Sequence, residues 1–168
     1  MSRILIDGFN LIHAASFQST PGDNEVASLV ELLRRYKRLK GHGITVILDG
    51  YLDGMPLEKS ERVKGIGLIY SRLGEKADQV IERLVGRWAG SCVVITSDRA
   101  LAESVEAAGA VVMGSEEFAQ RLRMVEYLEV KGGEVEEAPQ GPIHTRKKGN
   151  PRKKSKKERA RARSLKKL

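Results

Sequence analysis

Short apolar runs that end near an aspartate are the feature that most constrains this chain. The runs lie near residues 3–6, 44–48, 66–70, 92–96 and 110–112, and β-branched residues are frequent in them. Such runs are typical of strands buried on both faces, as in a parallel sheet covered by helices. Helical patterns separate the runs, which predicts right-handed crossovers between parallel strands. We therefore expect a three-layer α/β/α sandwich with a mainly parallel sheet.

The segments between these runs differ in how clearly they predict structure. Apolar residues recur at helical spacing in residues 24–41, 76–89, 99–108 and 115–130. Each of these segments is predicted to be a helix with one buried face. Residues 8–23 are predicted to form a loop. The polar residues 51–65 are predicted to form a loop or a short helix.

Four aspartates follow the ends of the first four runs. Asp7, Asp49 and Asp98 come at or just after strand ends, and Asp78 follows the third run after a short basic loop. The carboxyl ends of parallel strands share one edge of a sheet, and ligands bind there. Each aspartate alone could instead be a turn residue, a helix cap or a first-turn acid.

The position of all four aspartates at one edge of the sheet favours a shared functional site over four separate structural roles. Carboxylates gathered at one edge repel one another, and a bound cation is the usual reason to assemble them. Oxygen ligands suit Mg²⁺, and Mn²⁺ is an alternative. A cation held there can activate water and neutralise charge on a phosphate. The pattern thus predicts a metal-dependent nuclease. Zinc is disfavoured because the histidines and the single cysteine are scattered.

Basic charge is concentrated at the C-terminus. Residues 1–130 hold 16 Lys and Arg against 18 Asp and Glu, whereas residues 131–168 hold 14 against 4. The second segment has too few apolar residues for a core and is expected to be disordered alone. We therefore divide the chain into a nuclease domain, residues 1–130, and a basic RNA-binding tail, residues 131–168.

A polybasic tail could meet an anionic membrane as well as nucleic acid. No apolar stretch approaches the roughly 20 residues of a membrane span, and Asp7 interrupts the first apolar run where a signal peptide would continue. We expect a soluble cytoplasmic protein that does not bind membranes. The sequence predicts no particular oligomeric state.

Four short motifs occur in a fixed order: Asp7-Gly8-Phe9-Asn10-Leu11, Leu48-Asp49-Gly50, Gly74-Glu75-Lys76-Ala77-Asp78 and Thr96-Ser97-Asp98. Together they resemble the YacP-like NYN domain family of PIN-like nucleases over about residues 1–130. The resemblance implies an Mg²⁺-dependent endoribonuclease, since characterised bacterial members are linked to ribosome-associated mRNA cleavage. It also implies the strand order 3-2-1-4-5.

The resemblance assigns roles by position. It implies a catalytic, metal-binding core of Asp7, Asp78 and Asp98, with Asp49 as an outer metal ligand. It also implies that Asn10 orients or contacts the ligand. From their place on the same predicted edge of the sheet, and not from the resemblance, Ser97, Arg72 and Lys76 are further candidates for contact with the substrate. Lys76 stands where the family often has threonine, which could alter the substrate edge.

The leading hypothesis is cleavage of single-stranded or ribosome-bound mRNA, with RNA and the ribosome as partners. The alternative is a catalytically inactive RNA- or ribosome-binding module with the same fold and tail. A phosphatase-like hydrolase is less favoured. Phe9 stands where an aspartyl-phosphate enzyme would carry the second acid of an Asp-x-Asp pair.

Overall fold

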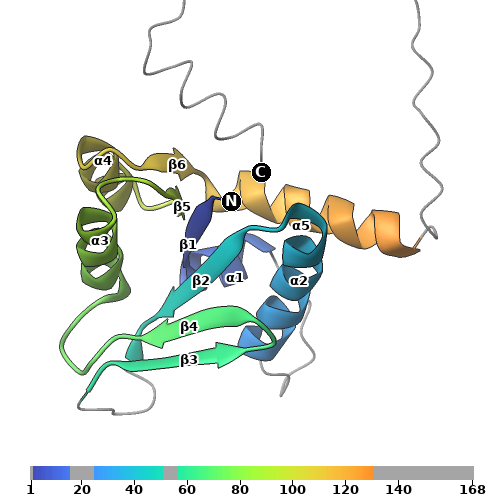
Figure 1. Ribbon diagram of the computed structural model, residues 1–168, viewed down its shortest axis with the longest axis horizontal. Helices are drawn as coiled ribbons and strands as arrows, with labels where there is room; N and C mark the ends of the chain where they lie inside the picture. The colour runs from blue at the N-terminus through green and yellow to red at the C-terminus, as the bar shows by residue number, and fades with distance from the viewer. Residues whose placement is uncertain (1, 16–24, 51–56, 131–168) are drawn as a thin grey trace, which may run out of the picture.

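The computed structural model describes residues 2–15, 25–50 and 57–130 (Figure 1). The strands are β1 (Arg3–Asp7), β2 (Gly43–Leu48), β3 (Lys59–Val63), β4 (Ile66–Tyr70), β5 (Val93–Ile95) and β6 (Val111–Met113). The helices are α1 (Gly8–Ala15), α2 (Glu25–Lys40), α3 (Ala77–Arg87), α4 (Arg99–Ala107) and α5 (Ser115–Val130). No helix in these ranges is long and apolar enough to cross a membrane.

The strands form one sheet in the order β3-β4-β2-β1-β5-β6. All pairings are parallel except that of β3 with β4. Without β3, the order is the 3-2-1-4-5 order that the family resemblance implied. β1 therefore lies between β2 and β5, with Asp7 opposite Ile47 and Ile6 opposite Ile95. The parallel strands all end at one edge, hereafter the carboxyl edge.

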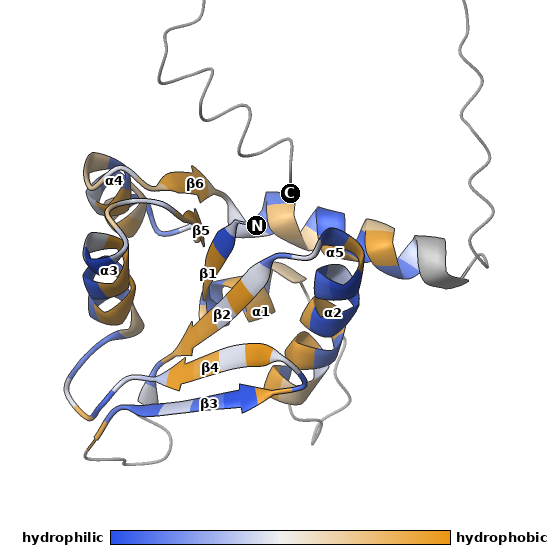
Figure 2. Cartoon of the chain, viewed as in Figure 1, coloured by the Kyte–Doolittle hydropathy of each residue, from blue (hydrophilic) through white to orange (hydrophobic). Residues whose placement is uncertain are grey.

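Helices cover both faces of the sheet, which confirms the α/β sandwich. Ile4 and Ile6 of β1 pack with α1, α2 and α5 on one face, while Leu5 packs with α3 and α4 on the other. This division follows from the alternation of side chains along a strand. Both faces of β1 are apolar, and its central residues are at most 1% exposed. Figure 2 shows the apolar colour along the central strands.

The segment after β1 begins with a helix where the sequence predicted a loop. Helix α1 follows β1 directly, because Asp7 Oδ1 accepts a hydrogen bond from the Asn10 backbone N–H (3.2 Å) and so caps the first turn. Leu11 and Ile12 are buried on its inner side. Gly8 permits the abrupt junction, because a Cβ there would lie 2.4 Å from the Leu48 side chain. The predicted loop was therefore wrong for residues 8–15, and residues 16–23 lie outside the described ranges.

A second prediction was wrong at the sheet edge. Residues 59–63, expected as loop or short helix, form strand β3, antiparallel to β4. Lys64 (φ 49°) and Gly65 (φ 84°) make the tight turn between the two strands. Two successive positive φ angles suit the twist of a two-residue hairpin. The rest of that expectation, residues 51–56, lies outside the described ranges.

Candidate active site at the carboxyl edge

The structure brings four aspartates together at the carboxyl edge. Asp7 ends β1, Asp49 follows β2, Asp78 lies in the first turn of α3, and Asp98 precedes α4. Burial raises the pKa of Asp78, and the charges of Asp7, Asp98 and Asp49 raise it further. This electrostatic coupling means that the four carboxylates share one neighbourhood. We call them the acidic cluster.

Asp7 is the most buried member of the acidic cluster, at 6% exposure. Its Oδ2 accepts a hydrogen bond from Asn10 Nδ2 (2.7 Å) and a longer one from Thr96 Oγ1 (3.3 Å). These donors come from α1 and from the end of β5. They fix the position of a carboxylate that would otherwise be costly to bury.

Thr96 belongs to one of the four motifs, but no role was assigned to it from the sequence. Its hydroxyl donates to Asp7 and also accepts a hydrogen bond from the Asp98 backbone N–H (3.1 Å). Thr96 thereby joins two members of the acidic cluster from a single strand end. The available signal was a hydroxyl residue closing a buried strand two positions before an aspartate.

Asp49 and Asp98 cap helices as Asp7 does, so the structural alternative raised for the aspartates is observed for these three. Asp98 Oδ1 accepts from the Leu101 backbone N–H (2.9 Å) and caps α4. Asp49 Oδ1 accepts from the Ala77 backbone N–H (2.6 Å) at the start of α3, 28 residues away. Each of these bonds uses one carboxylate oxygen. Capping and a role in the acidic cluster are therefore compatible.

Asp78 differs from the other three members. It is half-buried, and no hydrogen bond from the described residues contributes to its pKa. Burial and the neighbouring acids raise the pKa of Asp78, and the charge of Lys76 lowers it by a smaller amount. The helix dipole favours a carboxylate in this first turn, but burial and like charges outweigh that effect. A negative charge on Asp78 is thus disfavoured by its surroundings, a property common at functional sites.

The family resemblance implies a bound metal ion, and the described residues can be tested for their ability to hold one. Within residues 2–15, 25–50 and 57–130, no three His, Cys, Asp or Glu side chains are arranged to hold a metal ion. The acidic cluster is therefore not a preformed cage. Its oxygen donors nevertheless suit Mg²⁺, which keeps several waters and needs only one or two carboxylates. The chemistry of these donors, though not a preformed geometry, matches that of a hydrated Mg²⁺ or Mn²⁺ site.

The other predicted site residues lie at or near the same edge but differ in their contacts. Lys76 is exposed at the start of α3, and the mostly exposed Arg72 pairs with Glu75 (3.3 Å). Ser97 is already engaged, because its Oγ accepts from the Ser115 backbone N–H (3.2 Å). The side-chain amide of Asn10 donates a hydrogen bond to Asp7, so Asn10 is placed to orient the Asp7 carboxylate.

A pocket of about 490 Å³ lies beside the β4–α3 loop. Its described lining consists of Leu57, Glu58, Arg72, Glu75 and Arg83. The two arginines are paired within it, because Arg83 contacts both Glu58 and Glu75 and Arg72 contacts Glu75. The pocket thus brings together the guanidinium groups of Arg72, on the loop that leads to the acidic cluster, and Arg83, on α3.

Protonation of Asp78 is expected to stabilise the metal-free fold. Its pKa is raised above the ordinary value of 3.8, so the folded state binds this proton more tightly than the unfolded state. The stabilisation is complete below the ordinary value and is lost as the pH rises through the raised value. Carboxyl-carbon NMR titration should show a raised, coupled transition that added Mg²⁺ lowers. Four independent, unshifted transitions would contradict a shared site.

Gly50 holds the loop after Asp49 against Ser71. Its backbone N–H donates to Ser71 Oγ (3.1 Å), and a Cβ at Gly50 would lie 1.8 Å from the Ser71 carbonyl oxygen. We expect Gly50→Ala to lower the free energy of unfolding by about 1–3 kcal/mol, measured by urea denaturation. Gly86→Ala is the control. A Cβ at Gly86 has open space within α3, so a gain of up to about 1 kcal/mol is expected. Equal effects would contradict the close contact at Gly50.

Comparison with known proteins agrees with the fold. Two crystal structures of Rae1 (YacP) from Bacillus subtilis are similar to this chain. A mutant form has 20% identity and a TM-score of 0.63, and the match covers 81% of this chain and 87% of that one. The other has 22% identity and a TM-score of 0.62, covering 78% and 79%. None of the curated proteins matches the chain.

The family comparison covers nearly the whole sequence. The family model described as YacP-like NYN domain matches residues 4–168, which include all four aspartates and the basic C-terminal segment. The match agrees with the resemblance carried by the four motifs. The chain belongs to the YacP-like NYN domain family.

Proposed function

We propose that this protein is a metal-dependent endoribonuclease that cleaves single-stranded or ribosome-bound mRNA. The observation that carries the proposal is the coupling of Asp78 to Asp7, Asp98 and Asp49 at the carboxyl edge. Hydrogen bonds and caps account for three of these side chains, but they do not account for Asp78. Its placement among like charges is explained by a cation that binds during function.

Each member of the acidic cluster has a proposed task. Asp7, Asp78 and Asp98 would hold Mg²⁺ or Mn²⁺, with Asp49 as an outer ligand. When bound, the ion would supply positive charge to the scissile phosphate and make water a better nucleophile. Asn10 and Thr96 would keep Asp7 oriented through their hydrogen bonds. Hydrolysis in this arrangement would leave a 5′-phosphate and a 3′-hydroxyl.

Substrate positioning falls to the basic residues of the β4–α3 loop. Arg72 and Lys76 are exposed and lie within six residues of Asp78 along the chain. Guanidinium groups suit phosphate because they donate two hydrogen bonds in a fixed plane. Arg72 and the pocket that it lines would therefore bind a phosphate next to the one that is cut.

The second candidate is an RNA- or ribosome-binding module without catalysis. Two observations favour it: Asp49 and Asp98 already serve as helix caps, and the described residues contain no preformed metal cage. In that case the carboxyl edge would have a structural role, and affinity would come from basic residues elsewhere.

One experiment separates the two candidates. Purified full-length protein is incubated with end-labelled RNA, with and without ribosomes, in Mg²⁺, Mn²⁺ or EDTA. Endonucleolytic products that appear with metal and vanish in EDTA would support the nuclease. RNA binding with intact RNA under every metal condition, on and off the ribosome, would support the binding module.

A further inference from the structure

A strongly basic surface lies away from the acidic cluster. Residues 31–40 together with Lys64 hold six Lys and Arg against one glutamate, leaving ten against 17 acids elsewhere in residues 1–130. The six cations are Arg34, Arg35, Lys37, Arg38, Lys40 and Lys64, and Glu61 of β3, whose partner Leu68 packs on the α2 side of the sheet, borders them. They come from α2 and the β3–β4 hairpin, and we call them the α2–hairpin surface. Figure 2 shows hydrophilic colour on α2 and along β3.

Several of these cations share a single carboxylate. Glu31 pairs with Arg34 (2.6 Å) and Lys64 (2.7 Å), and Arg35 lies 3.9 Å away. The hydrogen bonds from Arg34 and then Lys64 lower the pKa of Glu31 to about 2. Glu126 of α5 also lies 3.7 Å from Arg35, so these three cations face two carboxylates, and the other cations of the surface add further positive charge. The α2–hairpin surface therefore keeps a net positive field.

The surface is assembled from two elements that are fixed to each other. Lys37 Nζ donates to the Gly65 carbonyl oxygen (2.6 Å), and the Lys64–Glu31 pair bridges the same helix and turn. These contacts hold the hairpin turn against α2 (Figure 1). Positive charges from distant parts of the chain are thereby held in a defined arrangement before any ligand binds, which reduces the entropy lost on binding.

The helix dipole explains only part of this charge. Cations in the last turn of α2, such as Lys37, Arg38 and Lys40, are stabilised by the dipole. Arg34 lies a full turn earlier and Lys64 lies on another element. Arg34 and Arg38 are also like charges at i and i+4, a spacing that costs about 0.2–0.5 kcal/mol in a helix. The clustering thus exceeds what helix stability requires.

The α2–hairpin surface lies at the opposite edge of the sheet from the acidic cluster. α2 ends at Lys40, just before β2 begins, and the hairpin turn precedes β4. Both positions belong to the amino ends of parallel strands. We propose that the α2–hairpin surface is a second RNA-binding surface, which grips the phosphate backbone of a folded RNA. This inference concerns binding alone and does not depend on the proposed cleavage.

The chemistry of the surface favours RNA over a lipid membrane. Three of the six cations are arginines, and their planar guanidinium groups pair with phosphate oxygens through two hydrogen bonds. The exposed arginines Arg34 and Arg38 lie one helical turn apart, so they can contact separate phosphates along one groove. Contacts of this kind position an RNA without reading its sequence.

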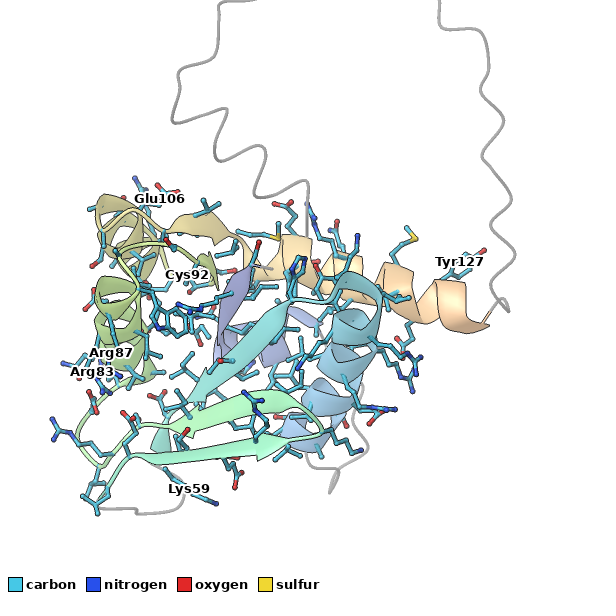
Figure 3. All side chains as sticks on the ribbon, viewed as in Figure 1. Lys59, Arg83, Arg87, Cys92, Glu106 and Tyr127 are labelled. Carbon is cyan, nitrogen blue, oxygen red and sulfur yellow. The ribbon has the colours of Figure 1, made fainter. Side chains whose placement is uncertain are left out.

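The test uses full-length protein and a labelled RNA hairpin in EDTA, so that cleavage does not interfere. The double variant Arg34→Gln/Arg38→Gln should bind the RNA about tenfold more weakly. The slope of log affinity against log salt concentration should become shallower by about two, one for each lost phosphate contact. Lys64→Gln should lower the slope by about one. Arg87→Gln is the matched control, because Arg87 is also an exposed arginine in the last turn of a helix. Figure 3 shows Arg87 on α3, across the molecule from α2.

The possible outcomes show whether RNA affinity depends on the α2–hairpin surface or on positive charge anywhere on the protein. Weakened binding in the α2 and hairpin variants with unchanged Arg87→Gln would support the proposal, whether or not the protein cleaves RNA. The proposal would be overturned if the double variant bound the RNA as tightly as the parent protein. It would also be overturned if Arg87→Gln lost as much RNA affinity as the double variant. Vesicles containing phosphatidylserine form a second arm. Loss of vesicle binding with unchanged RNA binding would also overturn the proposal, in favour of a membrane surface.

Discussion

Asp78→Asn is expected to reduce RNA cleavage by at least about a hundredfold while leaving the fold intact, since a neutral amide is a poor Mg²⁺ ligand. The substitution removes a charge that burial and the three neighbouring acids disfavour. The metal-free variant should therefore be at least as stable as the parent protein. Initial cleavage rates on labelled RNA and thermal unfolding in EDTA measure the two effects separately.

Two further variants sharpen this test. Glu103→Gln removes a mostly exposed carboxylate of α4 that pairs with Arg99, and it should leave cleavage unchanged. Asp7→Asn should also lose activity, but it should cost about 1 kcal/mol of stability as well. Its NH₂ group would face a donor in either orientation: the Asn10 backbone N–H at the Oδ1 position, or Asn10 Nδ2 and Thr96 Oγ1 at the Oδ2 position. Full activity in Asp78→Asn would remove the metal-site hypothesis.

Truncation after Val130 is expected to weaken RNA or ribosome binding by about a hundredfold at low salt, since each lost phosphate contact also loses counterion release. The removed segment, residues 131–168, carries a net charge of +10. Binding titrations at several salt concentrations should show a shallower salt dependence for the truncated protein. Cleavage of a short RNA at saturating concentration should change much less, because the acidic cluster lies entirely within the retained residues.

The control for truncation is the folded state of the shortened chain. Helix α5 ends at Val130, so the described sheet and helices are retained. Circular dichroism and cooperative unfolding should match those of the full-length protein. Equal affinities and equal salt slopes would mean that the tail has no RNA partner. Loss of the cooperative transition would instead place the domain boundary beyond residue 130.

The order of the sheet was predictable where burial on both faces left a clear pattern. β1 and β2 are nearly continuous apolar runs, and covered parallel strands require such runs. β3 was missed because an edge strand needs no such run; all its side chains are at least partly exposed. α1 was missed because it begins immediately after a strand, with Asp7 serving as both strand end and helix cap.

The acidic cluster was predictable in membership but not in detail. Strand ends in a parallel sheet converge, so position along the chain is enough to bring Asp7 and Asp49 to one edge. The direction of each side chain depends on partners that are distant in sequence. The bond from Ala77 to Asp49 spans 28 residues, and the one from Thr96 to Asp7 spans 89. No local pattern encodes such contacts.

The polar edge strand β3 has a consequence for solubility. An open sheet edge presents unpaired N–H and C=O groups that can recruit a strand from another molecule and begin aggregation. Here the outermost strand carries Lys59, Glu61 and Arg62, and the opposite edge strand, β6, has only three residues. Charged or very short edges disfavour such recruitment. Many copies of this domain could therefore crowd onto one polyanion without their sheets joining into a continuous β-structure.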